Sequence, residues 1–205
     1  MHKKPLIVFE GVEGSGKSLH ILNVANFLKK KKINFIRIRE PGGNSNSEKI
    51  RRLILNNKSK FNKTTDFFLY MASRNENIEM IIKKNIGKKI ILIDRFVDST
   101  VAYQHYGMNV NLKLIESINN FLLKNIKINF TFLNLVTPLN IKKRLSKRKT
   151  LNRYDKFKLG FYQKVQSGFI TLANKNKKKY LLINSNLSIK TNKKIIIEKI
   201  KKLIR

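Results

Sequence analysis

The 205-residue sequence contains no cysteine, and only twelve of its residues are acidic. The absence of cysteine excludes a disulfide framework, a thiolate zinc site and thiol chemistry. No apolar run approaches the roughly 20 residues that a membrane-spanning helix needs. The apolar stretch near the basic start of the chain ends before Glu10 and is too short for a signal peptide. These features predict a cytoplasmic protein with one domain, residues 1–205, and a substantial core.

Because acidic residues are few, the 45 Lys and Arg residues give the chain a net charge of +33. Such a charge can indicate a nucleic-acid-binding protein, since basic side chains gain affinity by releasing phosphate counterions. However, Lys, Asn and Ile are abundant throughout the chain, as an AT-rich genome would encode. The lysines also lack the interleaved aromatic residues of a base-stacking surface. We therefore expect a solvated basic surface, with neither nucleic acid nor membrane as a partner.

Arginine is scarce, since only ten of the 45 basic residues are Arg. A guanidinium group can bind a phosphate bidentately, which an ammonium group cannot do. Six of the ten lie in segments with other features of a site, namely Arg39, Arg74, Arg95, Arg144, Arg148 and Arg153. Carboxylates also collect at predicted strand ends, where open parallel sheets bind ligands. These carboxylates are Glu10, Glu13, Glu40, Asp94 and Asp98.

The stretch Gly11-Val12-Glu13-Gly14-Ser15-Gly16-Lys17-Ser18 matches the phosphate-binding pattern G-x-x-x-x-G-K-[ST] without a mismatch. A short apolar run precedes it and a helical pattern follows it, which is the order that the motif requires. In such a loop, backbone N–H groups and the positive end of the helix face the phosphates. We expect the loop to bind a nucleoside triphosphate, with Lys17 on the outer phosphates and the Ser18 hydroxyl on Mg²⁺.

Apolar runs predict five strands, at residues 6–9, 33–38, 90–94, 130–135 and 180–183. Helical patterns separate them, at residues 17–32, 45–57, 62–84, 98–104, 111–124, 138–147, 156–174 and from about 191. This alternation predicts an α/β fold, a doubly wound five-stranded parallel sheet flanked by helices. The third run closes on Asp94, which resembles the carboxylate that supports Mg²⁺ in phosphoryl-transfer enzymes, although a strand can also end on Asp as a helix cap.

The segment 142–158 is dense in charge. Arg144 and Arg148 are four residues apart in a predicted helix, so we expect them to share one helical face. Arg153 follows a polar tip at residues 149–152. A solvated basic helix and loop would account for the lysines. For the three arginines we predict a mobile lid, at about residues 142–156, that closes over phosphates.

Four segments together resemble the serial signatures of the thymidylate kinases. They are Phe9-Glu10-Gly11-Val12-Glu13-Gly14-Ser15-Gly16-Lys17-Ser18, Arg39-Glu40-Pro41-Gly42-Gly43, Asp94-Arg95-Phe96 and Ser99-Thr100-Val101-Ala102-Tyr103-Gln104. Their order and separation match the family, and the likeness extends loosely from residue 5 to about residue 185. The resemblance implies a P-loop nucleotide kinase that transfers the γ-phosphoryl group of ATP to dTMP. It also implies Mg²⁺ as a cofactor and a homodimer.

The resemblance implies that seven residues bind dTMP, namely Arg39, Tyr70, Arg74, Arg95, Thr100, Tyr103 and Gln104. The two arginines Arg39 and Arg95 match the positions that hold the dTMP phosphate. Tyr70 matches the ring that stacks on thymine, and Arg74 matches the residue that bonds a base carbonyl. Thr100 and Gln104 match residues that read the polar base edge. Tyr103 matches the ring that packs against the sugar and disfavours a 2′-hydroxyl; from the residues alone, the two tyrosines could equally be core aromatics.

The resemblance also implies which residues act in the transfer itself, namely Lys17, Arg95, Arg153, Arg148 and Glu13. Within this set, Arg153 is the predicted transition-state stabiliser of the lid, with Arg148 behind it. Glu13 would position the acceptor nucleotide, and Ser18 and Asp94 would support the metal. The acceptor is a phosphate whose second pKa is about 6, so it is mostly ionised at neutral pH and needs no general base. This chemistry requires charge neutralisation and no histidine.

The chain departs from the family pattern in three places. Phe96 stands where a Tyr is common in the family, which removes a hydroxyl. His105-Tyr106 precedes Gly107 where the family has a glycine directly after Ala-Tyr-Gln, so the loop there is expected to be reshaped. Asn184-Ser185 occupies the segment where the family has an aspartate near the adenine. None of the three departures touches the residues predicted to bind phosphate.

Three other functions compete with this interpretation. Another P-loop nucleoside monophosphate kinase would share the fold but should lack the pairs Tyr70/Arg74 and Thr100/Gln104. A GTPase switch would need an Asn-Lys-x-Asp element, and residues 62–66 have the wrong spacing for one. A nucleic-acid-binding protein that uses ATP only as a ligand would bind DNA in a salt-sensitive way and transfer no phosphoryl group to a free monophosphate.

Overall fold

The computed structural model describes residues 3–205, so residues 1 and 2 of the predicted domain lie outside the described part. Its core is a parallel sheet with the strand order β2-β3-β1-β4-β5. The strands are β1 (Leu6–Glu10), β2 (Phe35–Arg39), β3 (Ile90–Asp94), β4 (Phe130–Leu135) and β5 (Tyr180–Asn184). The predicted doubly wound five-stranded sheet is therefore confirmed, and each predicted strand lies within two residues of its observed bounds.

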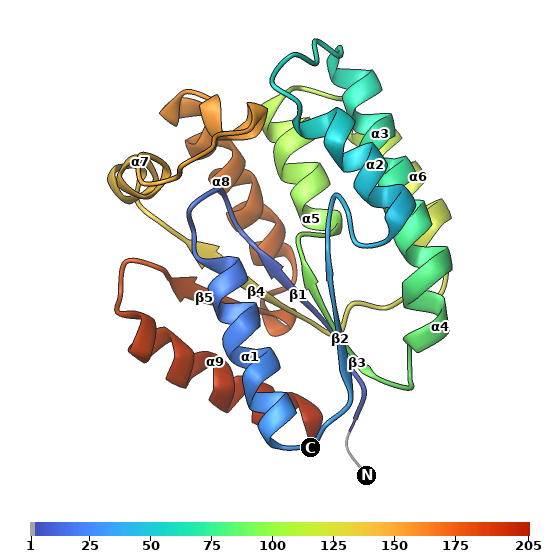
Figure 1. Cartoon of the computed structure of the whole chain (residues 1–205), viewed down its shortest axis with the longest axis vertical. Coiled ribbons are helices and arrows are strands. Elements are labelled where there is room, and N and C mark those ends of the chain that lie inside the picture. The colour runs from blue at the N-terminus through green and yellow to red at the C-terminus, as the bar shows by residue number, and fades with distance from the viewer. Residues whose placement is uncertain (1–2) are drawn as a thin grey trace.

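Helices cover both faces of the sheet (Figure 1). They are α1 (Lys17–Lys30), α2 (Ser45–Leu55), α3 (Lys63–Asn77), α4 (Lys83–Asn85), α5 (Val97–Thr100), α6 (Leu112–Leu123), α7 (Pro138–Leu145), α8 (Leu159–Lys175) and α9 (Ile189–Ile204). Two segments, η1 (Ile78–Ile82) and η2 (Val101–Gly107), are π-helical, and two short 3₁₀ helices are η3 (Arg153–Lys156) and η4 (Lys177–Lys179).

The alternation of side chains along β1 divides the core into two layers, because successive residues of a strand face opposite sides. Ile7 and Phe9 pack with α1 and α9 on one face. Leu6 and Val8 pack on the other face with η1 and the end of α6. The run is apolar throughout because β1 is buried on both faces, as in a parallel sheet covered by helices.

A further layer covers the carboxyl ends of the strands. Residues of α7, α8, η2 and η3 form one buried cluster with Val12 of the glycine loop. Within this cluster the ring of Tyr103 lies near those of Tyr154, Phe161 and Phe169. This aromatic layer connects the segment 138–175 to the edge of the sheet where ligands bind in open α/β folds.

Three predicted helices differ from the structure. The spacing of apolar residues over 62–84 predicts one continuous helix. In the structure this helix widens to π geometry at Ile78–Ile82. The pattern over 98–104 continues as a π-helix to Gly107. Helix α7 ends at Leu145, whose side chain is buried, and the backbone then turns with Arg148 N–H donating to the Leu145 carbonyl. Arg144 and Arg148 therefore do not share a helical face, and that expectation is wrong.

Candidate active site

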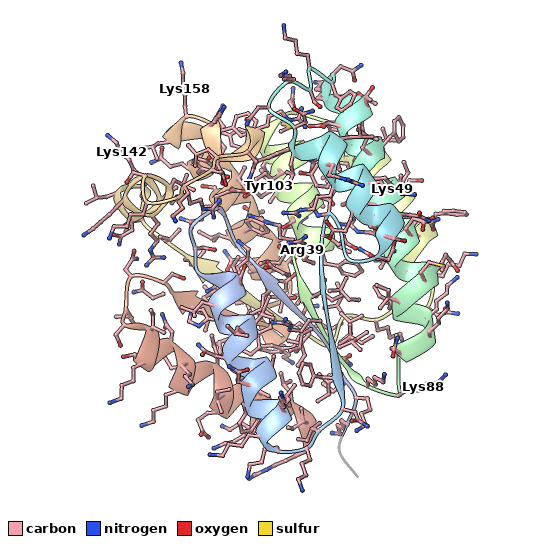
Figure 2. All side chains as sticks on the ribbon, viewed as in Figure 1. Arg39, Lys49, Lys88, Tyr103, Lys142 and Lys158 are labelled. Atoms are coloured by element: carbon pink, nitrogen blue, oxygen red, sulfur yellow. The ribbon has the colours of Figure 1, made fainter. Side chains whose placement is uncertain are left out.

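A cavity of ≈ 410 Å³ opens beyond the carboxyl ends of β1, β2 and β3. Segments that follow these strands line it, together with α3, η2 and the segment after α7. Six of the ten arginines line this cavity, namely Arg39, Arg51, Arg74, Arg95, Arg144 and Arg148. Figure 2 shows Arg39 and Tyr103 near the middle of the molecule, whereas Lys88, Lys142 and Lys158 project from its outside. The scarce guanidinium groups are concentrated where anions would bind.

The glycine loop connects β1 to α1 and folds around the ammonium group of Lys17. Lys17 Nζ donates to the carbonyls of Gly11 at 2.8 Å and Val12 at 2.9 Å, and to Ser15 Oγ at 3.3 Å. Burial, followed by the nearby charge of Arg95, lowers the pKa of Lys17 to about 7. The buried ammonium group is thus held by the loop's own oxygens at the opening of the first helix.

Glycine is required at the first position of the loop. Gly11 has φ of +136°, and a methyl group there would lie 2.4 Å from the carbonyl oxygen of Asn134 in β4. The close approach lets the loop turn directly over the sheet. Asn134 also donates its side-chain amide to the Ser15 carbonyl at 3.3 Å, which fixes the loop from below.

The two predicted metal-supporting residues meet at the end of the glycine loop. The Ser18 hydroxyl donates to Asp94 Oδ2 at 2.8 Å, and both residues line the cavity. A hydroxyl and a carboxylate are hard oxygen donors, and Mg²⁺ in kinases takes few protein ligands because it keeps waters and phosphate oxygens. Within residues 3–205, no group of three or more His, Cys, Asp or Glu could hold a metal ion. The pair therefore fits a Mg²⁺ ion that arrives with nucleotide phosphates.

Arg95, Glu13 and Tyr103 form a compact cluster beside the loop. Arg95 donates to the Gly11 carbonyl and to Glu13 Oε1, each at 2.9 Å, and the Tyr103 hydroxyl donates to Glu13 Oε2. The guanidinium carbon lies 5.0 Å from the centre of the Tyr103 ring. Burial alone would lower the pKa of Arg95, but Tyr103 and Glu13 outweigh it and raise that pKa. The cluster keeps one guanidinium charged and directed at the loop.

Arg74 of α3 is the centre of a buried polar network. It donates to Glu40 Oε2 at 2.9 Å, to Asn119 Oδ1 at 2.6 Å and to Thr100 Oγ1 at 2.9 Å. It also donates to the carbonyl of Phe96 at 2.9 Å. Its side chain is only 2% exposed, although it contributes to the cavity wall. Arg74 therefore forms part of the wall through contacts made with the protein itself.

The remaining predicted base-site residues lie around this wall. Tyr70, Thr100 and Gln104 all line the cavity. The amide nitrogen of Gln104 is buried and has no hydrogen-bond partner within the described part of the chain. The ring of Tyr70 meets that of Tyr154 edge-on, with centroids 5.9 Å apart. These side chains provide an aromatic face and a free amide donor at one end of the cavity.

The structure separates the three arginines of the predicted lid. Arg144 donates to the carbonyls of Gly14 at 2.8 Å and Ser185 at 2.6 Å, and Arg148 pairs with the carboxylate of Asp155. Both line the cavity. Arg153, by contrast, is absent from the cavity lining, because its guanidinium pairs with Asp66 of α3 at 2.5 Å.

Arg39 and Arg51 complete the set near the turn after β2. Arg39 lies at the cavity but is 55% exposed and pairs with Glu48 of α2 at 3.0 Å. Arg51 donates to the Pro41 carbonyl at 2.5 Å. Sequence reasoning missed Arg51, because it stands among charged residues of an exposed-looking helix. Its only signal in the sequence is that it is one of the ten arginines.

A second cavity, of ≈ 230 Å³, adjoins the other side of the glycine loop. Leu19, Arg144, Ser185 and Asn192 are among its lining residues. It lies at the segment after β5 where the sequence departs from the family pattern. Ser185 lines this cavity, whereas Asn184 is not part of its lining.

Comparison with known proteins places this geometry in a family. The model of the thymidylate kinase family matches residues 9–196. A thymidylate kinase of Mycoplasma capricolum subsp. capricolum is 37% identical over 203 residues, which cover 95% of each chain. A thymidylate kinase of Kosmotoga olearia is 34% identical over 185 residues, covering 89% of this chain and 88% of the relative.

The fold agrees with this similarity. The crystal structure of thymidylate kinase from Ehrlichia chaffeensis superimposes with a TM-score of 0.78 and 28% sequence identity, covering 97% of this chain and 98% of that chain. The glycine loop, the parallel sheet and the arginine-lined cavity described above are thus accompanied by similarity along nearly the whole sequence. The chain belongs to the thymidylate kinase family, whose members transfer a phosphoryl group from ATP to dTMP.

Proposed function

We propose that the ≈ 410 Å³ cavity is where dTMP becomes dTDP, with the two phosphate groups meeting between Lys17 and Arg95. One observation carries this assignment: Lys17 and Arg95 donate to the same acceptor, the Gly11 carbonyl, at 2.8 and 2.9 Å. The two cations come from different sides of the loop, one from the donor helix and one from the end of β3. If phosphate oxygens took over from this carbonyl as hydrogen-bond acceptors, they would contact both Lys17 and Arg95.

The donor and the acceptor approach this point from opposite sides. ATP phosphates would occupy the glycine loop, residues 11–18, where α1 begins. The base of dTMP would lie against Tyr70, with the free amide of Gln104 at its edge. Arg74 already donates to four protein groups. We therefore propose that it contacts the base as a fixed part of the cavity wall and keeps these hydrogen bonds. Glu13 would hold the acceptor sugar and phosphate beside Tyr103.

The reaction is an in-line displacement. A dTMP phosphate oxygen attacks the γ-phosphorus of ATP, a new P–O bond forms, and the bond to the β-phosphate oxygen breaks to release ADP. The attacking oxygen is mostly ionised at neutral pH, so the chain need only align two anions and neutralise the moving group. Mg²⁺, when bound, supplies charge to the β- and γ-phosphates, and Ser18 and Asp94 would hold it.

The lid supplies the remaining positive charge. Arg144 and Arg148 line the cavity, and they would contact the transferring group after exchanging part of their present partners for phosphate oxygens. Arg153 would join them only after leaving Asp66, so we propose that its contribution to the transition state requires a movement of residues 142–156.

We also propose that the protein is a cytoplasmic homodimer, as the resemblance to the family implies. Large apolar side chains are exposed on three neighbouring helices: Leu53 of α2 is 50% exposed, Phe68 of α3 49% and Phe121 of α6 68%. Packing of two copies would remove this apolar surface from water. Within residues 3–205, no helix is long and apolar enough to cross a membrane. Light scattering at micromolar concentration would show twice the chain mass of 24.0 kDa.

The decisive experiment is a coupled ADP-release assay with Mg-ATP and dTMP, dUMP, dCMP, dGMP and dAMP offered in parallel. We expect turnover that strongly favours dTMP. Turnover that favours another monophosphate would retain the phosphate assignments but refute the base site. ADP release that does not depend on any acceptor would contradict phosphoryl transfer. An Arg95→Lys variant should lose most of the turnover, because a compact ammonium cannot reproduce the planar geometry in which two guanidinium nitrogens hold Glu13 and the loop carbonyl.

A further inference from the structure

The π-helix η2 crosses α8 at two glycines, one on each helix. A methyl group at Gly168 of α8 would lie 2.6 Å from Cγ and Cδ2 of Tyr106 and 2.9 Å from its Cβ. A methyl group at Gly107 of η2 would lie 2.7 Å from the Phe161 ring of α8. Each helix therefore lacks a side chain where the other presents an aromatic ring. This reciprocal fit sets how closely the two helices approach.

The contact at Gly168 reaches the backbone of η2. Rotation of the Tyr106 ring could move the outer ring atoms, but its Cβ is attached directly to the main chain. A methyl group 2.9 Å from that Cβ would therefore shift the backbone of η2, or of α8, by several tenths of an ångström. Protein interiors transmit such displacements because they are closely packed.

The helix η2 also carries two residues of the proposed acceptor site. Tyr103 and Gln104 are three and two residues before Tyr106, and both line the cavity. The Tyr103 ring lies against Phe161 and Phe169 of α8, with centroids 6.1 and 6.2 Å apart. The Tyr103 hydroxyl also holds Glu13 of the glycine loop. A shift of η2 against α8 would consequently displace the acceptor side of the cavity.

We propose that Tyr106 and Gly168 are positioning residues for the acceptor nucleotide: their contact fixes η2 so that Tyr103 and Gln104 face the bound dTMP. This inference rests on the proposed assignment of the cavity. It also gives a role to the departure at His105-Tyr106, where the family has glycine. The chain accommodates the larger side chains in a π-helix, a geometry that often occurs at functional sites.

The test compares two alanine substitutions in the same helix. Gly168→Ala adds a methyl group against Tyr106, whereas Gly160→Ala, also in α8, has no atom within 4 Å of its new methyl group. We expect Gly168→Ala to raise the KM for dTMP, and the Kd for dTMP in calorimetry, by about tenfold or more, with the KM for ATP changed by less than about twofold. Gly160→Ala should match the unsubstituted protein in all three quantities.

A double-mutant cycle identifies the cause. Tyr106→Ala should raise the KM for dTMP because η2 loses its support, and the double variant Gly168→Ala/Tyr106→Ala should be no worse than Tyr106→Ala alone. If Gly168→Ala does not fold, Tyr106→Ala and Gly107→Ala test the same crossing. The proposal is overturned if the effects of the two single substitutions add, or if the KM values for dTMP and ATP rise equally. An unsubstituted protein that prefers another monophosphate would instead refute the base site.

Discussion

The guanidinium of Arg153 pairs with the carboxylate of Asp66, 87 residues earlier in the chain. The hydroxyl of Tyr154 donates to the same carboxylate at 2.7 Å. Asp66 lies in the first turns of α3, the helix that also carries Tyr70 and Arg74. The predicted lid is thereby fastened to α3, on the side of the cavity where we propose that dTMP binds, rather than directed at the proposed donor loop.

Replacement of Arg153 tests whether this residue leaves Asp66 during the reaction. We expect Arg153→Ala to lower kcat by about tenfold or more while the Kd for dTMP changes by less than about threefold, since the lost contact would form in the transition state. Lys156→Ala, on the same short helix and exposed, serves as the control. Steady-state kinetics and calorimetry measure both quantities. An unchanged kcat would show that Arg153 only anchors the lid.

Tyr70→Ala should weaken dTMP binding by about tenfold to a hundredfold, because stacking of a base on an aromatic ring contributes roughly 1–3 kcal/mol. Tyr70→Phe keeps the ring and should bind dTMP nearly as well as the unsubstituted protein. Calorimetric titration with dTMP in the absence of ATP measures the effect directly. Equal affinities of the alanine variant and the unsubstituted protein would remove Tyr70 from the base site.

Binding of Mg-ATP should take up a proton at pH 8 and much less at pH 6. Burial and Arg95 lower the pKa of Lys17 to about 7, so its amine is mostly neutral in the free protein at pH 8. The triphosphate favours the ammonium form and raises that pKa again. Calorimetry in buffers of different ionisation enthalpy detects the proton. Lys17→Arg stays charged and should show no uptake, and a buffer-independent enthalpy for the unsubstituted protein at pH 8 would contradict the prediction.

Glu10→Gln should change how stability depends on pH. Burial, and next the charge of Asp98, raise the pKa of Glu10 from 4.5 to about 7. Between these two values the folded protein binds the proton more tightly than the unfolded chain, so this contribution to stability is lost as pH rises toward 7 and above. The loss is on the order of 1–3 kcal/mol.

Urea unfolding at pH 5 and pH 7.5 measures this difference. Stability of the unsubstituted protein should fall across the interval, and that of Glu10→Gln should fall less. Glu79→Gln, at an exposed ion pair, is the matched control and should follow the unsubstituted protein. Parallel pH profiles for all three would show that Glu10 does not carry the dependence.

The centre of the sheet could be predicted because β1, β3 and β4 are short, largely apolar runs that are buried almost throughout. The glycine loop was equally accessible, since its glycines, Lys17 and Ser18 are adjacent in sequence. Periodicity could not predict the π geometry of Ile78–Ile82, because an apolar face continues through it with little change of spacing. Nor could it place the end of α7, which depends on Leu145 entering the core formed with α8.

Contacts between residues far apart in the sequence were the second feature that could not be predicted. Nothing near Arg153 in the sequence indicates Asp66, and nothing near Arg51 indicates the Pro41 carbonyl. The scarcity of arginine in this lysine-rich chain helped to predict site residues where the spacing of residues along the sequence did not. That signal located five of the six predicted arginines at the cavity, and it failed for Arg153, where the guanidinium serves a carboxylate.

The network around Arg74 divides the cavity into parts of different rigidity. Four protein groups already hold its guanidinium, so the end of the cavity that we propose for the base is ordered before any nucleotide binds. Binding of dTMP there should cost little conformational entropy. The conformational entropy lost during the catalytic cycle should instead come from the ordering of residues 142–156. Selection of the base should then depend on its fit to a preformed shape more than on rearrangement of the protein around it.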